Sequence, residues 1–333
     1  MNFNITSNIK EILVKSQDDG IARQDAKTLL QLPLHSIETY ALMYAADRLS
    51  REEFNNKGEN HFHIGINIEP CPYNCRFCSL AQKAGVFTNP VEFSREQIVK
   101  WAMQGEVQGV DALNIMTGGT LAFENLLEIG RVLKKNVKTP IVANTRDITH
   151  KEGEMLLEAG FVGAYHAVRL GEGKDTPFKR KNRVRTIQTI RDVGLLWMNC
   201  IEPVGPEHDM DEIIDLMFLA REYKATYSGV MRRINFPSSP LEKHGMITEF
   251  ELARMVAISR LVMGRIPKAH CTHEANTACL AAGANLFFPE KGSSPRDCEG
   301  DTGKGRGLDM EECSRLQQEM GWDSALVSNC FTI

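Results

Sequence analysis

Short apolar segments alternate with amphipathic segments along most of this chain, from residue 62 to residue 289. The short segments favour strands and lie at 62–68, 112–116, 140–144, 163–168, 195–201, 227–234, 268–272 and 285–289. The longer segments carry apolar residues at helical spacing and lie at 94–108, 124–135, 150–159, 183–193, 211–223, 249–263 and 273–282. Strands that alternate with helices in this way predict a parallel sheet.

The number of strand–helix units predicts a closed α/β barrel. Eight units over about 230 residues fit the (β/α)8 TIM-type architecture, in which active sites lie at the carboxyl ends of the strands. We expect residues 61–290 to form this barrel. Residues 1–60 show helical spacing, interrupted at Pro33, and predict an N-terminal helical extension. Residues 291–333 include a glycine-rich stretch and predict a C-terminal tail or lid over the barrel mouth.

Three cysteines directly after the first expected strand form the strongest chemical motif. Cys71, Cys75 and Cys78 have C-x3-C-x2-C spacing. A structural zinc site needs four closed ligands, and ferredoxin motifs have other cysteine spacings, so both alternatives fit this loop less well. Three thiolates on a cluster of four irons leave one iron open to bind another molecule. The loop therefore predicts a 4Fe–4S cluster with an open iron at the barrel mouth.

Composition narrows the classes of function. The net charge is −4, which gives no electrostatic reason to expect nucleic-acid binding. Residues 1–15 lack the apolar core of a secretory signal, and no stretch approaches the ~18 apolar residues of a membrane span. The nine cysteines indicate a reducing compartment and metal chemistry. We therefore expect a cytoplasmic protein that binds neither membrane nor nucleic acid.

Small and polar residues follow several other expected strands. Gly118 and Gly119 follow the second strand, where glycine permits close backbone approach to a ligand but is also common in ordinary turns. Arg169 lies near the end of the fourth strand, where a guanidinium group can hold a carboxylate by paired hydrogen bonds or can simply be solvated. Beside the cysteine loop, these residues predict a binding site for a polar small molecule.

Two further cysteines lie near strand ends. Cys200 falls near the end of the fifth expected strand and Cys271 near the end of the seventh. Buried cysteines are often small packing residues. Above a site that already holds iron, however, two thiols also predict an auxiliary iron–sulfur cluster. A third ligand is expected from the tail, which carries Cys298, Cys313 and Cys330, and Cys313 is the preferred candidate.

The cysteine loop resembles the motif of the radical S-adenosylmethionine (SAM) enzymes, and the rest of the chain resembles their biotin synthase branch. The likeness runs from about residue 29 to residue 322. It includes Leu29-Leu-Gln-Leu-Pro-Leu, Ser239-Pro-Leu-Glu and Cys279-Leu-Ala-Ala-Gly-Ala-Asn. The resemblance implies that SAM binds the open iron and is cleaved to a 5′-deoxyadenosyl radical. It also implies contacts to SAM and the clusters from Tyr73, Gly118, Gly119, Thr120, Arg169 and Glu202.

The chain departs from the common form of biotin synthase at its second cluster. That form holds a 2Fe–2S cluster with three cysteines and an arginine. Cys200 matches one of these cysteines, but Asn114-Ile-Met-Thr and Val142-Ala-Asn-Thr replace the segments that carry the other two. Cys271 stands close to the place of the arginine. The resemblance therefore points to a divergent, anaerobe-type branch with a different auxiliary cluster, expected to contain four irons.

The resemblance implies a sulfurtransferase of biotin biosynthesis that inserts sulfur into dethiobiotin under anaerobic conditions. Its implied partners are dethiobiotin and a flavodoxin or ferredoxin that donates electrons, and a homodimer is compatible with it. Three alternatives stay open. One is a lipoyl synthase-like sulfur insertion, another is a hydrogenase-maturation-type radical SAM enzyme, and the third is a non-catalytic iron–sulfur sensor. A sensor needs neither the glycine pair nor converging polar groups.

Overall fold

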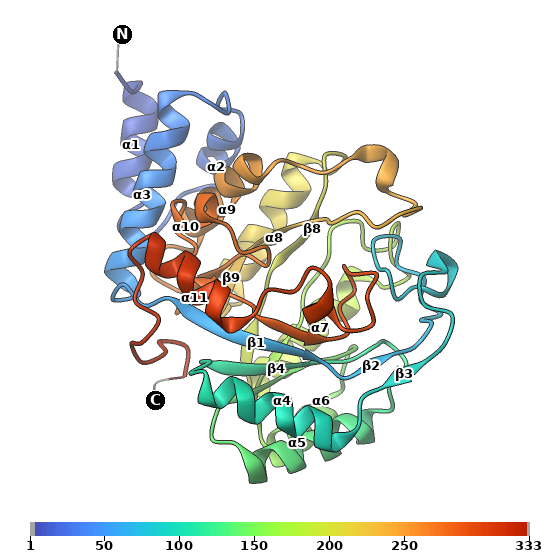
Figure 1. Cartoon of the computed structure of the whole chain (residues 1–333). Coiled ribbons are helices and arrows are strands. Elements are labelled where there is room, and N and C mark those ends of the chain that lie inside the picture. Colours follow the sequence, from blue (N-terminus) through green and yellow to red (C-terminus); the bar gives the residue numbers. More distant parts are fainter. Residues whose placement is uncertain (1–3, 332–333) are drawn as a thin grey trace.

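A ring of parallel strands forms the centre of the protein in the computed structural model, which describes residues 4–331 (Figure 1). Neighbouring strands pair in the order β1-β4-β5-β6-β7-β9-β10-β11, and β11 pairs back to β1 to close the ring. The bounds are β1 Glu59–Gly65, β4 Ala112–Met116, β5 Ile141–Asn144, β6 Phe161–Tyr165, β7 Leu196–Met198, β9 Tyr227–Arg232, β10 Ala269–Cys271 and β11 Leu286–Phe287. This closed eight-strand barrel confirms the predicted fold class.

Helices surround the ring and alternate with its strands, as the periodicity predicted. Those of the barrel are α4 Arg95–Val107, α5 Phe123–Asn136, α6 His150–Glu158, α7 Arg180–Asp192, α8 Met210–Glu222, α9 Glu249–Met263 and α10 Thr277–Leu280. The N-terminal helices are α1 Ser7–Lys15, α2 Arg23–Leu30 and α3 Ile37–Glu53, of which α2 and α3 pack on α9. Within residues 4–331, no helix is long and apolar enough to cross a membrane.

Two strand positions are broken, which the sequence pattern did not indicate. β8 Ile201–Val204 continues the fifth position after a gap at Asn199 and Cys200. β12 Glu290–Gly292 continues the eighth position and pairs with the second half of β1. The side chain of Asn199 donates to the hydroxyl of Ser228 on β9 at 3.2 Å, a contact between distant residues that local periodicity cannot reveal. The first gap leaves Cys200 outside the regular strand ladder.

Alternation along β1 separates the two faces of the barrel wall. Phe62 and Ile64 pack among the residues of the surrounding helices. Residues at odd positions of a strand point to the opposite face, so Glu59, His61 and His63 lie on the inner face, and all three are buried. The barrel interior is therefore unusually rich in ionisable groups along this strand.

The C-terminal part of the chain reaches both ends of the barrel. Ser293, Pro295 and Arg296 line the pocket at the mouth, and the Ser293 hydroxyl donates to the carbonyl of Asn67 at 2.8 Å. Asn67 belongs to β2 Asn67–Ile68, which pairs antiparallel with β3 Val91–Glu92. Helix α11, Met310–Glu319, then packs beside β1. The final residues return to the start of β1, where the Gly58 amide donates to the carbonyl of Asp323 at 3.0 Å (Figure 1). Residues 293–296 thus lie at the mouth, whereas residues 323–330 lie at the opposite opening, the barrel floor.

Candidate functional site

The cysteine loop is held in shape by its own backbone and one asparagine. The Cys71 amide donates to the carbonyl of Leu80 at 2.8 Å, which draws the two ends of the loop together. Asn74 has a φ of 51°, in the left-handed region that asparagine tolerates better than most residues. Its side chain donates to the carbonyl of Pro72 at 2.8 Å and accepts from the amide of Lys83 at 2.7 Å. These contacts turn the loop tightly enough for its three thiols to face one cavity.

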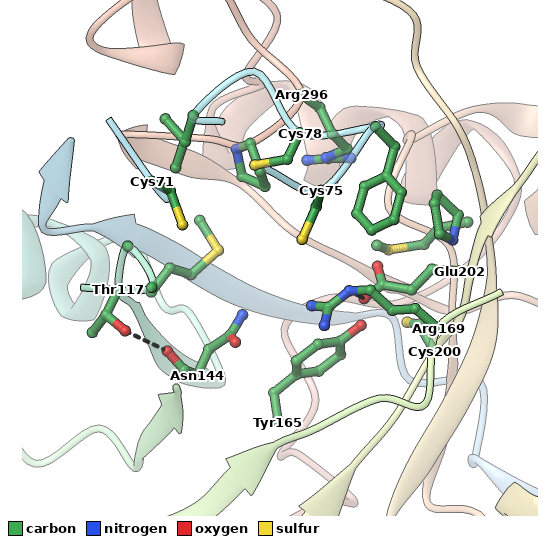
Figure 2. A pocket seen from close by; sticks show the side chains of 18 of the residues that line it. Cys71, Cys75, Cys78, Thr117, Asn144, Tyr165, Arg169, Cys200, Glu202 and Arg296 are labelled. Carbon is green, nitrogen blue, oxygen red and sulfur yellow. Dashed lines mark hydrogen bonds and ion pairs between the residues drawn. The ribbon is translucent and has the colours of Figure 1, made fainter. Parts of the chain in front are cut away.

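Cys71, Cys75 and Cys78 line the same pocket at the carboxyl ends of the strands (Figure 2). Burial raises the pKa of Cys75 to about 11 and the pKa of Cys78 to about 12. Both groups are therefore neutral thiols near pH 7, and a metal must displace their protons when it binds. Three converging, half-buried thiols on one short loop fit a cluster that takes three protein ligands.

The glycine pair after β4 lies against this loop. The Gly118 amide donates to Oδ1 of Asn67 at 2.8 Å. A Cβ atom at Gly119 would lie 3.0 Å from Sγ of Cys71 and 2.8 Å from the ring of Tyr73, so glycine is required for this approach. The hydroxyl of Thr120 donates to Glu69, which fixes the end of the same turn. Four of the residues expected to contact SAM thus stand beside the thiols, namely Tyr73, Gly118, Gly119 and Thr120.

Polar groups form the opposite wall (Figure 2). Arg169 and Glu202 make an ion pair with an Nε–Oε1 distance of 3.2 Å. Burial is the largest single influence on Arg169 and would lower its pKa, but the surrounding acidic groups, Glu202 foremost, together outweigh burial and raise the pKa of the guanidinium group. The buried hydroxyl of Tyr165 has no hydrogen-bond partner within the described chain. This wall offers a fixed cation and a free hydroxyl to a polar ligand.

Cys200 also lines the pocket, and Cys271 lies directly behind it. Their Sγ atoms are 2.9 Å apart, both residues are buried, and burial raises the pKa of the Cys200 thiol. Cys313 packs instead with Trp322 in a separate apolar cluster beside α11. The structure thus corrects the expectation that Cys313 joins the pair. The tail cysteine that shares an apolar cluster with Cys200 and Cys271 is Cys330.

Comparisons with known proteins agree with this arrangement. No family model matches the chain. The chain is 21% identical over 263 residues to biotin synthase of Clostridioides difficile, covering 75% of this chain and 80% of that protein. It is 25% identical over 289 residues to biotin synthase of Fusobacterium nucleatum, covering 80% and 79%. These likenesses confirm the resemblance to biotin synthase among the radical SAM enzymes.

Solved structures share the fold of this chain. Methylornithine synthase (PylB) aligns over 96% of this chain and 98% of its own, with a TM-score of 0.79 at 16% identity. HydG, a maturase of the FeFe-hydrogenase, aligns over 98% of this chain and 79% of its own, with a TM-score of 0.79 at 12% identity. The family likeness supports a 4Fe–4S cluster and SAM as cofactors.

One part of the pocket was not predicted from the sequence. Arg296 donates to Nε2 of His273 and to Oε1 of Glu290, each at 2.7 Å. The ring of Phe288 stacks on both His63 and His273, with centroids 4.4 and 5.1 Å apart. His63 could have been found from the alternation along β1, which points it inward. Arg296 could not, because it reaches the pocket from the distant tail.

The glycine-rich segment after Arg296 is folded rather than extended over the opening. The buried carboxylate of Asp297 accepts hydrogen bonds from the amide of Arg306 at 2.7 Å and the hydroxyl of Thr302 at 2.9 Å. At the other end of the segment, the Ser79 amide donates to the carbonyl of Pro295 at 2.9 Å. We expected a lid here. The structure instead shows a hydrogen-bonded loop, and the bond from Ser79 to Pro295 attaches this loop to the cysteine loop.

Proposed function

We propose that this protein is a radical SAM enzyme that inserts sulfur into dethiobiotin. Cys71, Cys75 and Cys78 would hold a 4Fe–4S cluster, and SAM would bind beside the glycine turn after β4. When bound and reduced, this pair of cofactors supplies a 5′-deoxyadenosyl radical that removes hydrogen from an unactivated carbon. The role of the chain is to orient SAM, to hold the substrate next to it and to exclude water.

One observation carries the sulfur-insertion proposal. Cys200 lines the same pocket as the cysteine loop and has the thiol of Cys271 2.9 Å behind it. Paired thiols are suitable ligands for an auxiliary iron–sulfur cluster, and sulfur supplied there would be next to the substrate. The names of the curated relatives favour dethiobiotin as that substrate.

Two arginines at the pocket support a substrate that carries a carboxylate. Arg169 and Arg296 both line the pocket, and each already contacts a buried carboxylate, Glu202 or Glu290. A guanidinium group has N–H donors left over after such a contact, so each arginine can also donate hydrogen bonds to the carboxylate of a ligand. Dethiobiotin and SAM each have one carboxylate, so we assign one cation to each without fixing the order.

The first test is product formation. The protein should be reconstituted with iron and sulfide under strict anaerobiosis, reduced, and supplied with SAM. We expect 5′-deoxyadenosine, with a higher yield and biotin formation when dethiobiotin is present. Cys71→Ala should abolish the cleavage of SAM, whereas Cys298→Ala, at an exposed cysteine, should retain it. Absence of 5′-deoxyadenosine from the fully reconstituted protein would contradict the proposal and favour the sensor.

The second test concerns the sulfur source. Replacing Cys200 and Cys271 together with alanine should lower bound iron to about four atoms per chain, the content of one cubane cluster, while SAM cleavage continues. Biotin formation should be lost. Unchanged iron content in this double variant would refute the auxiliary site and leave the pair as a packing contact.

The alternatives are separated by the same assay. An octanoyl-peptide that raises the yield of 5′-deoxyadenosine when dethiobiotin does not would favour a lipoyl synthase-like activity. Radical formation without any auxiliary iron would favour a maturase-type enzyme, a possibility that the likeness to HydG keeps open. Comparing flavodoxin with ferredoxin as the reductant identifies the electron donor, and light scattering tests the homodimer.

A further inference from the structure

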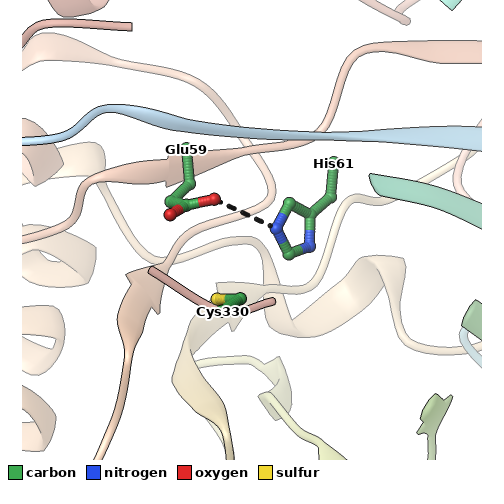
Figure 3. Close-up of side chains that lie close together, drawn as sticks. All are labelled: Glu59, His61 and Cys330. Atoms are coloured by element: carbon green, nitrogen blue, oxygen red, sulfur yellow. Dashed lines mark ion pairs between the residues drawn. The ribbon is translucent and has the colours of Figure 1, made fainter. Parts of the chain in front are cut away.

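A second group of metal-ligating side chains lies at the barrel floor. Glu59, His61 and Cys330 each place one ligand atom within 4.8 Å of the other two (Figure 3). Two come from the start of β1, and the third comes from the last described residues of the chain. None of these three is among the described residues that line the pocket at the barrel mouth. The group therefore calls for a separate explanation.

The imidazole of His61 is the clearest sign of a missing ligand. The residue is completely buried, yet neither ring nitrogen has a hydrogen-bond partner among residues 4–331. Oε2 of Glu59 lies 3.5 Å from Nε2 of His61, a weak contact for two buried polar groups. An imidazole nitrogen that carries no proton offers its lone pair to a metal ion. Buried polar atoms are rarely left without a partner in native proteins.

The charges around this group also favour a cation. Lys57 is buried and pairs with Asp111, with an Nζ–Oδ1 distance of 2.9 Å. Together with Glu59 and His61, these side chains contain two carboxyl groups and one ammonium group. A divalent ion beside Glu59 would offset the remaining negative charge and that of a Cys330 thiolate.

Glu59 and Cys330 are already oriented by hydrogen bonds. The carboxylate of Glu59 accepts from the Ser328 hydroxyl at 2.9 Å and from the Asn329 amide at 2.6 Å. The Cys330 amide donates to the same Ser328 hydroxyl at 3.1 Å. Such hydrogen bonds orient ligands in metal sites, where outer contacts fix the carboxylate and leave a lone pair for the metal. The backbone thus presents Cys330 to Glu59 and His61.

We propose that Glu59, His61 and Cys330 bind one zinc ion, which fastens the end of the chain to the barrel floor. Carboxylate, imidazole and thiolate are the three protein ligand types of Zn²⁺, with bonds of about 2.0–2.3 Å. A tetrahedral ion with such bonds separates its ligand atoms by about 3.3–3.8 Å, so side-chain movements of about 1 Å close the site. The thiol of Cys330 releases one proton to solvent on binding, and water takes the fourth position.

A neighbouring group shows why this site is preferred. His63, His273 and Glu290 also bring their ligand atoms within 4.8 Å of one another. There, however, Arg296 donates to both His273 and Glu290 at 2.7 Å, so a cation already satisfies them. No arginine or lysine donates to His61 within the described structure. The floor group lacks such a contact, because Lys57, the cation close to it, is paired with Asp111.

The proposal is tested by counting zinc and identifying its ligands. Protein produced in zinc-supplemented medium should contain about one zinc per chain by mass spectrometry. Absorption at the zinc K-edge should show one sulfur neighbour at about 2.3 Å and nitrogen or oxygen neighbours at about 2.0–2.1 Å. These wild-type measurements need no variant and are resolved from the iron edge. Substoichiometric zinc, below about 0.1 per chain, or a zinc shell without sulfur would overturn the proposal.

Matched variants then assign the site. Cys330→Ser and His61→Gln should each reduce bound zinc at least tenfold, whereas Cys279→Ser, at another buried cysteine, should retain it. Iron content and SAM cleavage should stay at wild-type values in Cys330→Ser, because the proposed site is separate from the proposed radical chemistry. Loss of iron from Cys330→Ser, with zinc unchanged, would instead assign this thiol to the auxiliary cluster and refute the zinc site.

Discussion

Substituting alanine for Gly119 tests whether close contact with the cysteine loop is the reason for glycine after β4. The new methyl group would lie 3.0 Å from Sγ of Cys71 and 2.8 Å from the ring of Tyr73. Carbon atoms in comfortable contact are about 3.5–4.0 Å apart, so both neighbours must move by about 0.5–1 Å. Tyr73 is partly exposed and can rotate away. Any shift of Cys71, by contrast, moves the thiol that is expected to bind the cluster.

The size of the effect follows from this forced movement. Overpacking typically costs about 1–3 kcal/mol, and about 1.4 kcal/mol corresponds to a factor of ten in affinity. If the cost falls on the loop, Gly119→Ala should bind SAM about 5- to 140-fold more weakly, as measured by anaerobic equilibrium dialysis of the reconstituted protein. Its thermal unfolding should change little, because the contact involves the loop rather than the barrel core.

A control glycine separates this effect from a general cost of alanine. A Cβ atom at Gly300 would lie 3.7 Å from Ile68, an ordinary contact, so Gly300→Ala should bind SAM like the wild type. Wild-type affinity and full iron content in Gly119→Ala would refute the reasoning. Equal losses of SAM affinity in both variants would show that the contact with Cys71 is not the cause, and would also refute the reasoning.

Three further outcomes follow from buried polar contacts. Lys57→Met should lower the free energy of unfolding by about 3–5 kcal/mol in denaturant titrations, because the Asp111 carboxylate loses its buried cation. The double variant Lys57→Met with Asp111→Asn should recover much of this lost stability. Burial lowers the pKa of His166 to about 4, so between pH 6.5 and 4 the unfolded chain binds a proton that the folded chain does not. Wild-type stability should therefore fall by about 2 kcal/mol more than that of His166→Gln from pH 6.5 to 5, and parallel pH profiles would contradict this. Asp297→Ala removes the acceptor for Arg306, so amide exchange in 297–306 should accelerate, and unchanged exchange would show that the loop has other supports.

Sequence reasoning succeeded where the determining contacts are local. The period of apolar residues depends on neighbours within a few positions, and it predicted the barrel and the order of its elements. The cysteine loop is also local, since Cys71 to Cys78 close their own turn. Its ligand role and that of Cys200 with Cys271 remain predictions.

The contacts that sequence reasoning missed join residues far apart in the chain. Arg296 meets His273 only because the tail returns to the mouth, and Cys330 meets His61 only because the same tail continues to the floor. The expectation for Cys313 failed for a related reason. Its place on α11 follows from the packing of Trp322 and Phe287, which the spacing of cysteines does not reveal.

Because the C-terminal segment touches both openings of the barrel, biosynthesis has a fixed order. The cysteine loop is translated more than 200 residues before Pro295, which supports it, and before Asn329, which contacts Glu59. During synthesis the loop is therefore present without its cover, and the barrel is open at both ends. Cofactor loading should accordingly follow synthesis of residues 293–331, and a chain truncated before Pro295 should lose order at the cysteine loop as well as at the barrel floor.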